Sequence, residues 1–561
     1  MILPAVPDRA VDELGRTEGG PETLGLLVRD QHTRRLLLLR AVLDAAESAA
    51  PDVCPAAALN RLRADWSLLE EAERRERSAN PDPVSLHPGP VSLHPGPVSV
   101  HPGPVSGNLH PLSPYLNPAS PNPNPASPSP NPASPGLIPA SPGLIPASPG
   151  LIPASPNPNP LSPNPVSLVR GFLLHPFIGP WARATLRALG AGTGPLPGRD
   201  AREQDRALAH FGALAAAAAA RAGVSYAVRL TAHDGVLALP SLGALRTGAP
   251  GSGATEVTVV HRRGRLTFRR RGETDVVVRP QSGTGAWSES AAWTSAYTLP
   301  GLVPGSAAVP LDDLDPYRTA RGGPRPDTLS GPAALDEADR KHWLHTWSGT
   351  AAALATGGGN RLAESAALLR CMVPLAAPPG SVPGGTGGSC SGTRREAFGA
   401  ILSSAPATAT AFAATLVHEI QHAKLAALSD MVTLHHASPE ARHFAPWRPD
   451  PRPYDGLLQG AYSHLALADF FQRSALAATL PARRDAAWAQ HARCQAQVGA
   501  VLPALVGSGD LTVRGRRFVD RMVEVYERLA EQPPPRGHAA RATAYVQAAR
   551  TLWNRRHAPG E

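Results

Sequence analysis

The stretch Phe412-Ala413-Ala414-Thr415-Leu416-Val417-His418-Glu419-Ile420-Gln421-His422 carries the strongest structural signal in this sequence. An apolar run leads directly into a His-Glu-x-x-His motif. On a helix, residues four positions apart share one face, so the imidazoles of His418 and His422 can reach a single metal ion. Glu419 lies to the side of that face, where in zinc peptidases it polarises the metal-bound water. The sequence therefore predicts a mononuclear metal site on a buried helix; the alternative is a polar helix face with an accidental histidine pair.

The third ligand decides the class of enzyme, and the usual peptidase ligands are missing. A metzincin has another histidine six residues after the second one, but here that position is Leu428. A gluzincin needs a glutamate on a following helix. Between His422 and Glu524 the sequence has one glutamate, Glu440, in a segment that reads as a turn. A peptidase is therefore less favoured than the motif alone indicates.

The helix expected over 456–469 offers His464 and Asp469 as ligands instead. We favour His464, with Asp469 and Asp430 as alternatives. Three nitrogens, or two nitrogens and a carboxylate, suit non-haem iron(II) with coordination positions left open for oxygen.

The whole chain predicts an α+β protein with a mainly helical catalytic half packed on a modest antiparallel sheet. Residues 1–79 read as a helical segment, 168–330 as a mixed segment of helices and strands, and 331–561 as the helical segment that carries the motif. The sheet is expected at about 223–280, where runs rich in strand formers alternate with turns. The expected elements of the mixed segment are helices at Trp181 to Leu189 and Ala201 to Ala222, and strands at Tyr226 to Leu230, Val236 to Leu239, Thr255 to Val260, Leu266 to Arg269 and Asp275 to Val278.

Residues 80–167 differ in character from everything around them. The heptamer Val-Ser-Leu-His-Pro-Gly-Pro begins at Val84 and Val91, and Pro-Ala-Ser-Pro-Gly-Leu-Ile begins at Pro132 and Pro139. Proline every two or three residues removes backbone donors and forbids a helix, so we expect an extended or disordered insertion between two halves of one fold. The regularly spaced histidines of this tract are interpreted as copies made by duplication, and not as metal ligands.

Composition excludes several classes of function. Lys and Arg number 54 against 45 Asp and Glu, but the arginines are dispersed and aromatic residues make up only 5%, so nucleic acid is not an expected partner. The four cysteines are far apart and form no Cys-x-x-Cys pair, which argues against a zinc ribbon and a disulfide scaffold. The first fifteen residues do not read as a signal peptide, and no apolar run is long enough to span a membrane. We expect a cytoplasmic protein.

Several blocks of the sequence are similar to the actinobacterial HExxH-motif domain, a family that occurs alone or fused behind radical SAM maturases. The blocks that carry the resemblance are Ser391 to Ala400, Leu416 to Leu425, Ala445 to Pro453 and Gly456 to Phe470, with Leu311 to Arg318 and Arg34 to Leu43 upstream. The resemblance covers most of the chain outside 80–167. It implies an iron(II)- and 2-oxoglutarate-dependent enzyme that β-hydroxylates residues of a ribosomally made peptide, with a radical SAM maturase as partner.

On this resemblance His418, His422 and His464 hold the iron, while Glu419 orients a ligand or a water molecule. Trp447 is a candidate wall of the peptide groove, although a tryptophan in such a place is more often part of the core.

The distal carboxylate of 2-oxoglutarate needs a cation, and the fork of an arginine side chain suits it. Arg395 and Arg452 are the candidates because they lie in the matching blocks, and Arg448 follows. Each of the three has an ordinary ion pair as its alternative role.

Two other functions remain open on the sequence. A zinc metallopeptidase would use Glu419 as its general base. A non-catalytic partner in peptide maturation would keep the motif without its metal. Neither the target peptide nor the residue modified can be read from the chain.

Overall fold

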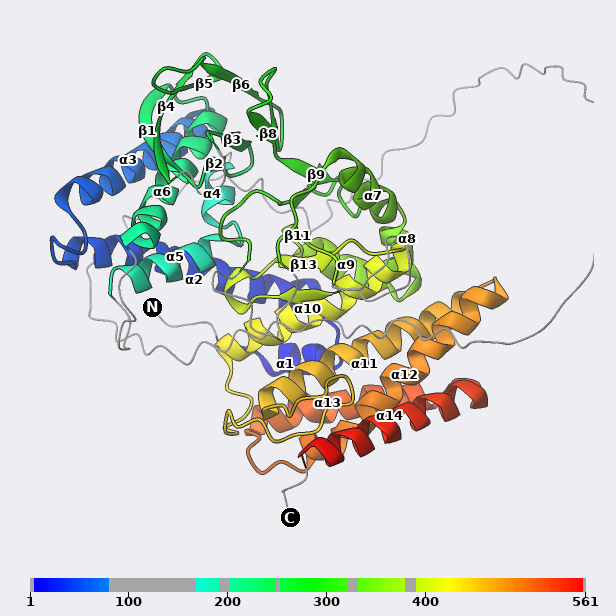
Figure 1. Cartoon of the computed structure of the whole chain (residues 1–561). Helices are drawn as coiled ribbons and strands as arrows, with labels where there is room; N and C mark the ends of the chain where they lie inside the picture. The colour runs from blue at the N-terminus through cyan, green and yellow to red at the C-terminus, as the bar shows by residue number, and fades with distance from the viewer. Residues whose placement is uncertain are drawn as a thin grey trace, which may run out of the picture.

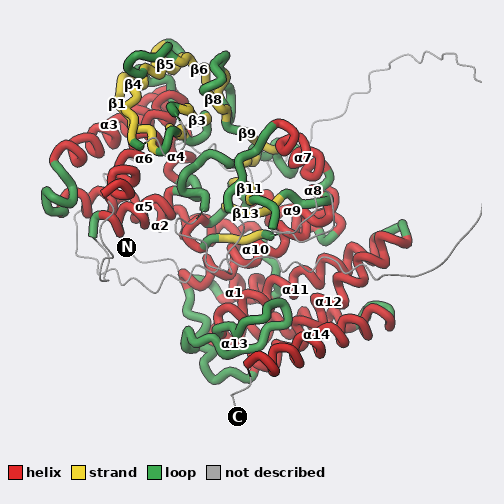
Figure 2. Tube along the Cα trace, in the orientation of Figure 1, coloured by secondary structure: helices red, strands yellow, loops and turns green. Residues whose placement is uncertain are grey.

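The structure, a computed structural model, describes residues 5–79, 168–190, 201–248, 253–319, 331–378 and 390–557. Helices predominate over two β-sheets, so the chain is a mixed α/β protein (Figures 1 and 2). The proline-rich tract at 80–167 lies outside the described residues.

The helices fall into an N-terminal group, a central group around the His-Glu-x-x-His motif, and a C-terminal bundle. Their bounds are α1 (Asp8–Gly15), α2 (Pro21–Ser48), α3 (Ala56–Ala79), α4 (Leu168–Leu173), α5 (Ile178–Ala188), α6 (Ala201–Arg221), α7 (Glu337–Ser348), α8 (Thr350–Thr356), α9 (Gly359–Leu368), α10 (Ala409–Met431), α11 (Tyr454–Ala477), α12 (Pro481–Val506), α13 (Val513–Ala530) and α14 (Arg536–His557). The helices expected at 181–189 and 201–222 are confirmed as α5 and α6, within a few residues at each end.

The first sheet is the antiparallel one that the sequence predicts, and it is larger than expected. Its order is β7-β6-β5-β4-β1-β2-β3-β8. Two of its hairpins turn at Asp234-Gly235 and Arg263-Gly264, where all four residues have positive φ, as two-residue type I′ turns require. The strands are β1 (Tyr226–His233), β2 (Val236–Leu239), β3 (Gly243–Arg246), β4 (Ala254–Arg262), β5 (Arg265–Arg269), β6 (Val276–Pro280), β7 (Ala286–Trp287) and β8 (Trp293–Ser295).

The second sheet was not predicted. Its order is β12-β13-β11-β10-β9, with β10, β11 and β13 parallel and the two outer strands antiparallel to their neighbours. The strands are β9 (Tyr297–Leu299), β10 (Val309–Leu311), β11 (Cys371–Leu375), β12 (Ser391–Thr393) and β13 (Ala400–Ser404). The expectation that the chain is mainly helical beyond Gly331 therefore misses β11, β12 and β13. Every residue of β11 and β13 is buried, and a short, fully buried apolar run has no periodicity that separates strand from helix.

This second sheet lies between two hydrophobic cores. Side chains alternate between the two faces of a strand, so Met372 and Ile401 join the core around α10 and α11, while Val373 and Leu402 join the core under the large sheet. Helix α10 runs beneath β11 and β13, with the C-terminal bundle on its other side (Figure 1). The motif helix is thus enclosed between the sheet and the bundle.

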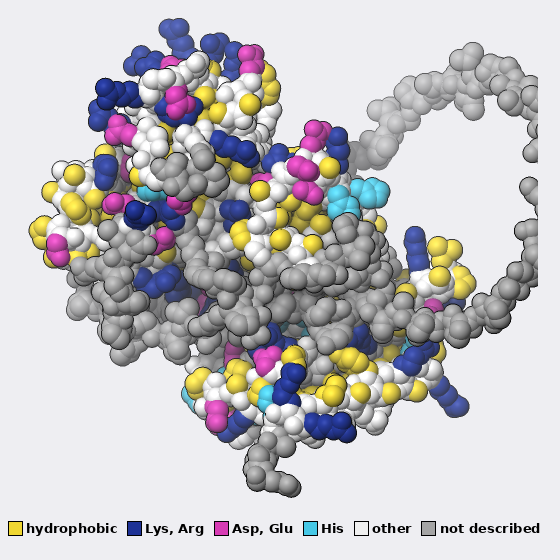
Figure 3. Space-filling model, viewed as in Figure 1, with side chains coloured by type: hydrophobic (Ala, Val, Ile, Leu, Met, Phe, Trp, Pro, Cys, Tyr) yellow, Lys and Arg dark blue, Asp and Glu magenta, His cyan; other side chains and the backbone are white. Residues whose placement is uncertain are grey.

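The surface view shows arginine side chains over the β4–β5 end of the large sheet (dark blue, Figure 3). Arg262, Arg263 and Arg265 are exposed there. That nucleic acid is not a partner stays a prediction. In the described ranges, no helix combines the length and the apolar character that crossing a membrane requires.

Candidate metal centre

Helix α10 begins at a defined cap and is buried on nearly every side. The side chain of Thr408 accepts a hydrogen bond from the backbone N–H of Ala411 at 3.1 Å, which satisfies one of the free donors of the first turn. Phe412 then packs edge-on against Trp343 and Trp347, with ring centroids 5.4 and 5.1 Å away. A helix that is apolar almost all round is a core helix, so polar groups on α10 are buried with it.

His418 and His422 face each other across one turn of α10. Their Nε2 atoms are 3.1 Å apart, and the two residues are 3% and 4% exposed. The sequence prediction that the two imidazoles share one face is confirmed. Two ligand nitrogens on one ion, each at about 2.0–2.1 Å from it, lie at a similar separation.

His464 on α11 is the third imidazole of this group. Its ring centroid is 5.4 Å from that of His418. Its Nδ1 donates to the backbone carbonyl of Gly460 at 2.8 Å, and a carbonyl can only accept, so the proton is on Nδ1 and the lone pair on Nε2. His422 has the same arrangement, because its Nδ1 lies 3.1 Å from Oε1 of Gln459. Such contacts fix the tautomer of metal-binding histidines.

Burial also keeps these imidazoles uncharged, as metal ligands must be. It lowers the pKa of His422 to about 4, against the opposing effect of the Gln459 hydrogen bond. It lowers the pKa of His464 to about 4 as well, opposed by the hydrogen bond to Gly460.

The chemistry of these three imidazoles fits a metal ion. The pair His418 and His422 is preformed and His464 is its neighbour. Yet no group of three or more His, Cys, Asp or Glu side chains in the described part of the chain already has the spacing of a complete metal site. The donor set is therefore a two-histidine pair with an adjacent third imidazole, and not a converged triad.

Glu419 points from α10 toward the edge strand β12. The hydroxyl of Ser391 donates to its Oε1 at 2.7 Å, and the same oxygen is 4.0 Å from Nε2 of His418. Its Oε2 is buried without a hydrogen-bond partner. Burial raises the pKa of Glu419 to about 8, opposed by the hydroxyls of Ser391 and Thr393. This carboxyl is positioned to act on a group held at His418.

Helix α11 presents a stripe of two glycines and His464 to the loop before it. A Cβ on Gly460 would lie 2.4 Å from Cζ2 of Trp447, and one on Gly456 would lie 2.9 Å from an Nη atom of Arg452. Both side chains therefore lie directly against the helix, and the indole of Trp447 stacks on His464 with ring centroids 4.6 Å apart. The two glycines make room for these contacts.

Arg452 is the candidate arginine that the structure brings to the histidines. Its charge contributes to lowering the pKa of His422, after burial and against Gln459. Two backbone hydrogen bonds with His443 hold it in place, at 2.8 and 2.9 Å. Arg448 lies in the same loop, 3.0 Å from Asp450, which is also 3.6 Å from Arg452.

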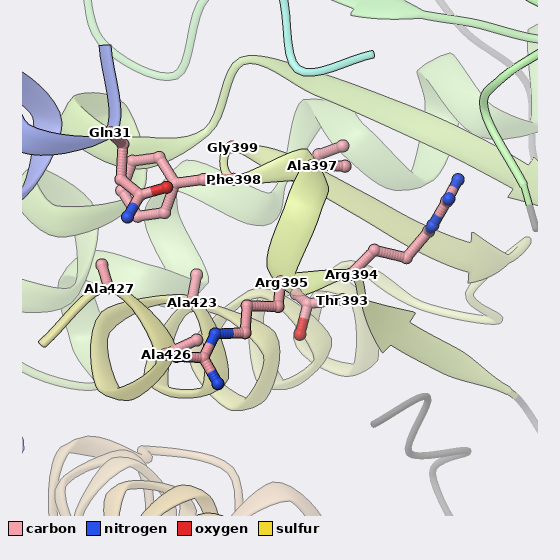
Figure 4. Close-up of a pocket in the computed structure, with 11 residues that line it drawn as sticks. Gln31, Thr393, Arg394, Arg395, Ala397, Phe398, Gly399, Ala423, Ala426 and Ala427 are labelled. Atoms are coloured by element: carbon pink, nitrogen blue, oxygen red, sulfur yellow. The ribbon is translucent and has the colours of Figure 1, made fainter. Parts of the chain in front are cut away.

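Three other candidates do not join the histidines. Figure 4 shows Arg395 running over Ala423 and Ala426 of α10. Its guanidinium pairs with Asp430, two turns beyond His422. The carboxylate of Asp430 accepts a hydrogen bond from Arg395, so it is already paired away from the histidines.

Asp469 lies in a separate buried network, where it accepts from Arg361 at 3.3 Å and Arg473 at 3.0 Å. Of the possible third ligands, the structure thus brings only His464 next to the pair.

Sequence reasoning missed two polar groups of the centre. Gln459 has no signal in the sequence, since one glutamine on a helix does not reveal which histidine it meets. Ser391 lies in one of the matching blocks, but its role depends on β12, which was not predicted.

Comparison of the chain with protein-family models and with curated proteins gives no match. The functional assignment therefore depends on this site and on the resemblance of the sequence blocks.

Proposed function

We propose that this protein is a non-haem iron(II)- and 2-oxoglutarate-dependent enzyme that hydroxylates residues of a ribosomally made peptide. The observation that carries the proposal is the presence of a third imidazole, His464, beside the His418 and His422 pair, where a peptidase of this motif would have a glutamate. A set of nitrogen ligands with open positions suits oxygen chemistry at iron.

His418, His422 and His464 would hold the metal, with Gln459 and the Gly460 carbonyl orienting two of the imidazoles. Iron, when bound, supplies the chemistry that couples oxidative decarboxylation of 2-oxoglutarate to insertion of one oxygen atom into a C–H bond.

Arg452 would bind the distal carboxylate of 2-oxoglutarate. Its side chain is 12% exposed, and a buried guanidinium gives a strong, directional hydrogen-bonded pair with a carboxylate. Arg448 is the alternative. Arg395 is a weaker candidate because its side chain is 55% exposed and already paired with Asp430, whereas those of Arg448 and Arg452 are 13% and 12% exposed.

Glu419 and Trp447 have supporting roles. Glu419 would orient a water molecule or a ligand near His418, with Ser391 fixing its carboxyl. Trp447 would exclude water from one side of His464 through their stacked rings. A radical SAM maturase remains an expected partner on the resemblance alone.

A zinc metallopeptidase is the second candidate, and the position of Glu419 favours it. Oε1 lies 4.0 Å from Nε2 of His418, so Glu419 could act as a base on a water that a metal on this histidine would hold. Against it, the side chain is fully buried and Ser391 occupies the same oxygen.

The test compares two reactions on one preparation. Protein loaded anaerobically with iron(II) is given 2-oxoglutarate and oxygen, and succinate is measured without peptide and with the peptide of a neighbouring short reading frame. We expect succinate, and a peptide heavier by one oxygen atom. Peptide cleavage with zinc alone would support the peptidase, and no metal bound at near-stoichiometric level would support a non-catalytic partner.

His464→Gln and His491→Gln form a matched pair for this assay. Both histidines lie on helices and donate from Nδ1 to a backbone carbonyl at 2.8 Å, but His491 is fully buried and bonds Ala468, outside the centre. The first substitution should abolish succinate formation and the second should preserve it.

A further inference from the structure

Four charged side chains from α9, α10 and α11 are buried together. Lys424 of α10 donates to Glu364 of α9 at 3.0 Å. Arg361, also on α9, lies 3.4 Å from Glu364 and 3.3 Å from Asp469 of α11. The side chains of the four are between 0% and 7% exposed. We call these residues the α9 charge network.

The N-terminal segment closes this network. The turn between α1 and α2 holds Thr17 with a φ of 63°, a left-handed conformation that costs free energy for a β-branched residue. Its carbonyl accepts from Lys424 at 3.0 Å and also from Arg361, whose other nitrogen is 2.9 Å from the Thr17 hydroxyl. The turn thus accepts the hydrogen bonds that Lys424 and Arg361 do not donate to Glu364 and Asp469.

Stability alone does not explain such a network. Taking charges out of water costs more than their attraction commonly returns, and apolar residues of the same volume often serve as well or better. What the α9 charge network does provide is directional contact between specific atoms of separate helices. It therefore fixes how those helices sit against each other.

The helices that it joins are the two that carry the histidines. Lys424 is two residues after His422, and Asp469 is five residues after His464. Lys424 and Asp469 are therefore the anchors of the network on α10 and α11, and Arg361 and Glu364 of α9 connect them by ion pairs. A slide or tilt of α11 against α10 would break the ion pairs, and it would also change the distance from His464 to the His418 and His422 pair.

We propose that the α9 charge network is a positioning device for the metal centre, which sets the place of His464 relative to the α10 pair. This inference rests on the proposed function, because it requires that the centre bind a metal. It also gives Asp469 a role: it holds α11 in place without being a ligand.

The test uses cobalt(II) as a spectroscopic metal with the full-length protein. The variant Glu364→Gln/Lys424→Met removes one charge of each sign and keeps the side-chain volumes. The control, Asp313→Asn/Arg340→Met, also removes one charge of each sign, at a pair 3.5 Å apart that is 3% and 20% exposed and lies off α10 and α11. Each protein is titrated with cobalt(II), its visible absorption bands are recorded, and unfolding of the metal-free form is measured separately.

We expect the network variant to bind cobalt(II) about 10- to 100-fold more weakly, as loss of supporting contacts around metal ligands typically does, and to show shifted absorption bands. The control should match the unaltered protein in both. Asp469→Asn, a smaller change at the other anchor, should shift the bands in the same way, and it decides the question if the double variant does not fold.

Equal cobalt affinity and identical bands in a folded network variant would overturn the inference and leave the metal centre standing. Failure of the unaltered protein to bind cobalt(II) would instead remove the metal centre, and the proposed function with it.

Discussion

Replacing Gly460 by alanine tests whether Trp447 is held between helix α11 and His464. A Cβ at position 460 would lie 2.4 Å from Cζ2 and 2.6 Å from Cε2 of the indole. Carbon atoms that are not bonded rest about 3.5–4.0 Å apart, so the indole has to move by about an ångström. Its plane is inclined by only 19° to the imidazole of His464, so this movement also disturbs the stack.

Two opposing effects set the magnitude. Alanine in place of glycine inside a helix gains about 1 kcal/mol. Overpacking costs about 1–3 kcal/mol, and the lost aromatic contact costs about 0.5–1.5 kcal/mol more. The net expectation for Gly460→Ala is a loss of about 0.5–3.5 kcal/mol in the free energy of unfolding. Gly25→Ala is the control, because its Cβ would meet only the flexible end of Arg29 at 3.2 Å. That variant should be more stable by up to about 1 kcal/mol.

The assay is urea unfolding followed by circular dichroism, with tryptophan fluorescence of the native state and a cobalt(II) titration beside it. Gly460→Ala should unfold at lower urea, change the fluorescence and bind cobalt(II) more weakly, while Gly25→Ala should do none of these. If Gly460→Ala instead gains as much stability as Gly25→Ala with unchanged fluorescence, Trp447 does not lie against α11, and its contact with His464 cannot support the site.

Three further predictions follow from the same structure. Phe412→Ala should cost about 3–5 kcal/mol of stability, because the ring is fully buried against two tryptophans, whereas Leu552→Ala, 66% exposed, should change urea unfolding by less than about 0.5 kcal/mol. Burial raises the pKa of Asp65 from 3.8 to about 7, opposed by a nearby arginine, so the folded state binds the proton more tightly than the unfolded chain. The free energy of unfolding should therefore fall as pH rises from 4 to 7, by at most about 1.4 kcal/mol per pH unit. Asp65→Asn should remove this slope, and an unchanged slope would contradict the prediction. Arg452→Met should raise the half-saturating 2-oxoglutarate concentration about 10- to 100-fold in the succinate assay, because a charged hydrogen bond is lost. Arg395→Met should leave this concentration unchanged. A large effect of Arg395→Met with none of Arg452→Met would show that Arg395 binds the carboxylate.

The sequence predicted those helices and strands that show a hydrophobic periodicity or are followed by a recognisable turn. Helices α10 and α11 show long apolar faces, and β1, β2 and β4 to β6 alternate with turns at positive-φ residues such as Gly235 and Gly264. The second sheet has neither signal. Its strands are short, and those at its centre are buried on both faces, so their existence depends on partners distant in sequence, as in the pairing of Met372 with Ile401.

The candidate site likewise has residues whose place could be predicted from the sequence and residues whose place could not. The spacing of His418 and His422 places them on one face of any helix, so the pair could be predicted from local geometry. His464 could be proposed because α11 is the next strong helix. The networks of Asp469 and Asp430 could not, because Arg361 and Arg395 approach them from elements whose packing no local pattern specifies.

The protonation pattern of the imidazoles separates a metal centre from a merely structural histidine cluster. Without a cation, the 3.1 Å contact requires His418 to donate from Nε2, because Nδ1 of His422 is already the donor to Gln459. Binding a cation then requires that the proton of His418 move from Nε2 to Nδ1, and this shift leaves the imidazole itself neutral. Nitrogen NMR of the histidines should therefore show this one tautomer change on adding zinc, with His422 and His464 keeping their protons on Nδ1. A cluster whose three tautomers stay fixed while zinc is added does not bind it through these nitrogens.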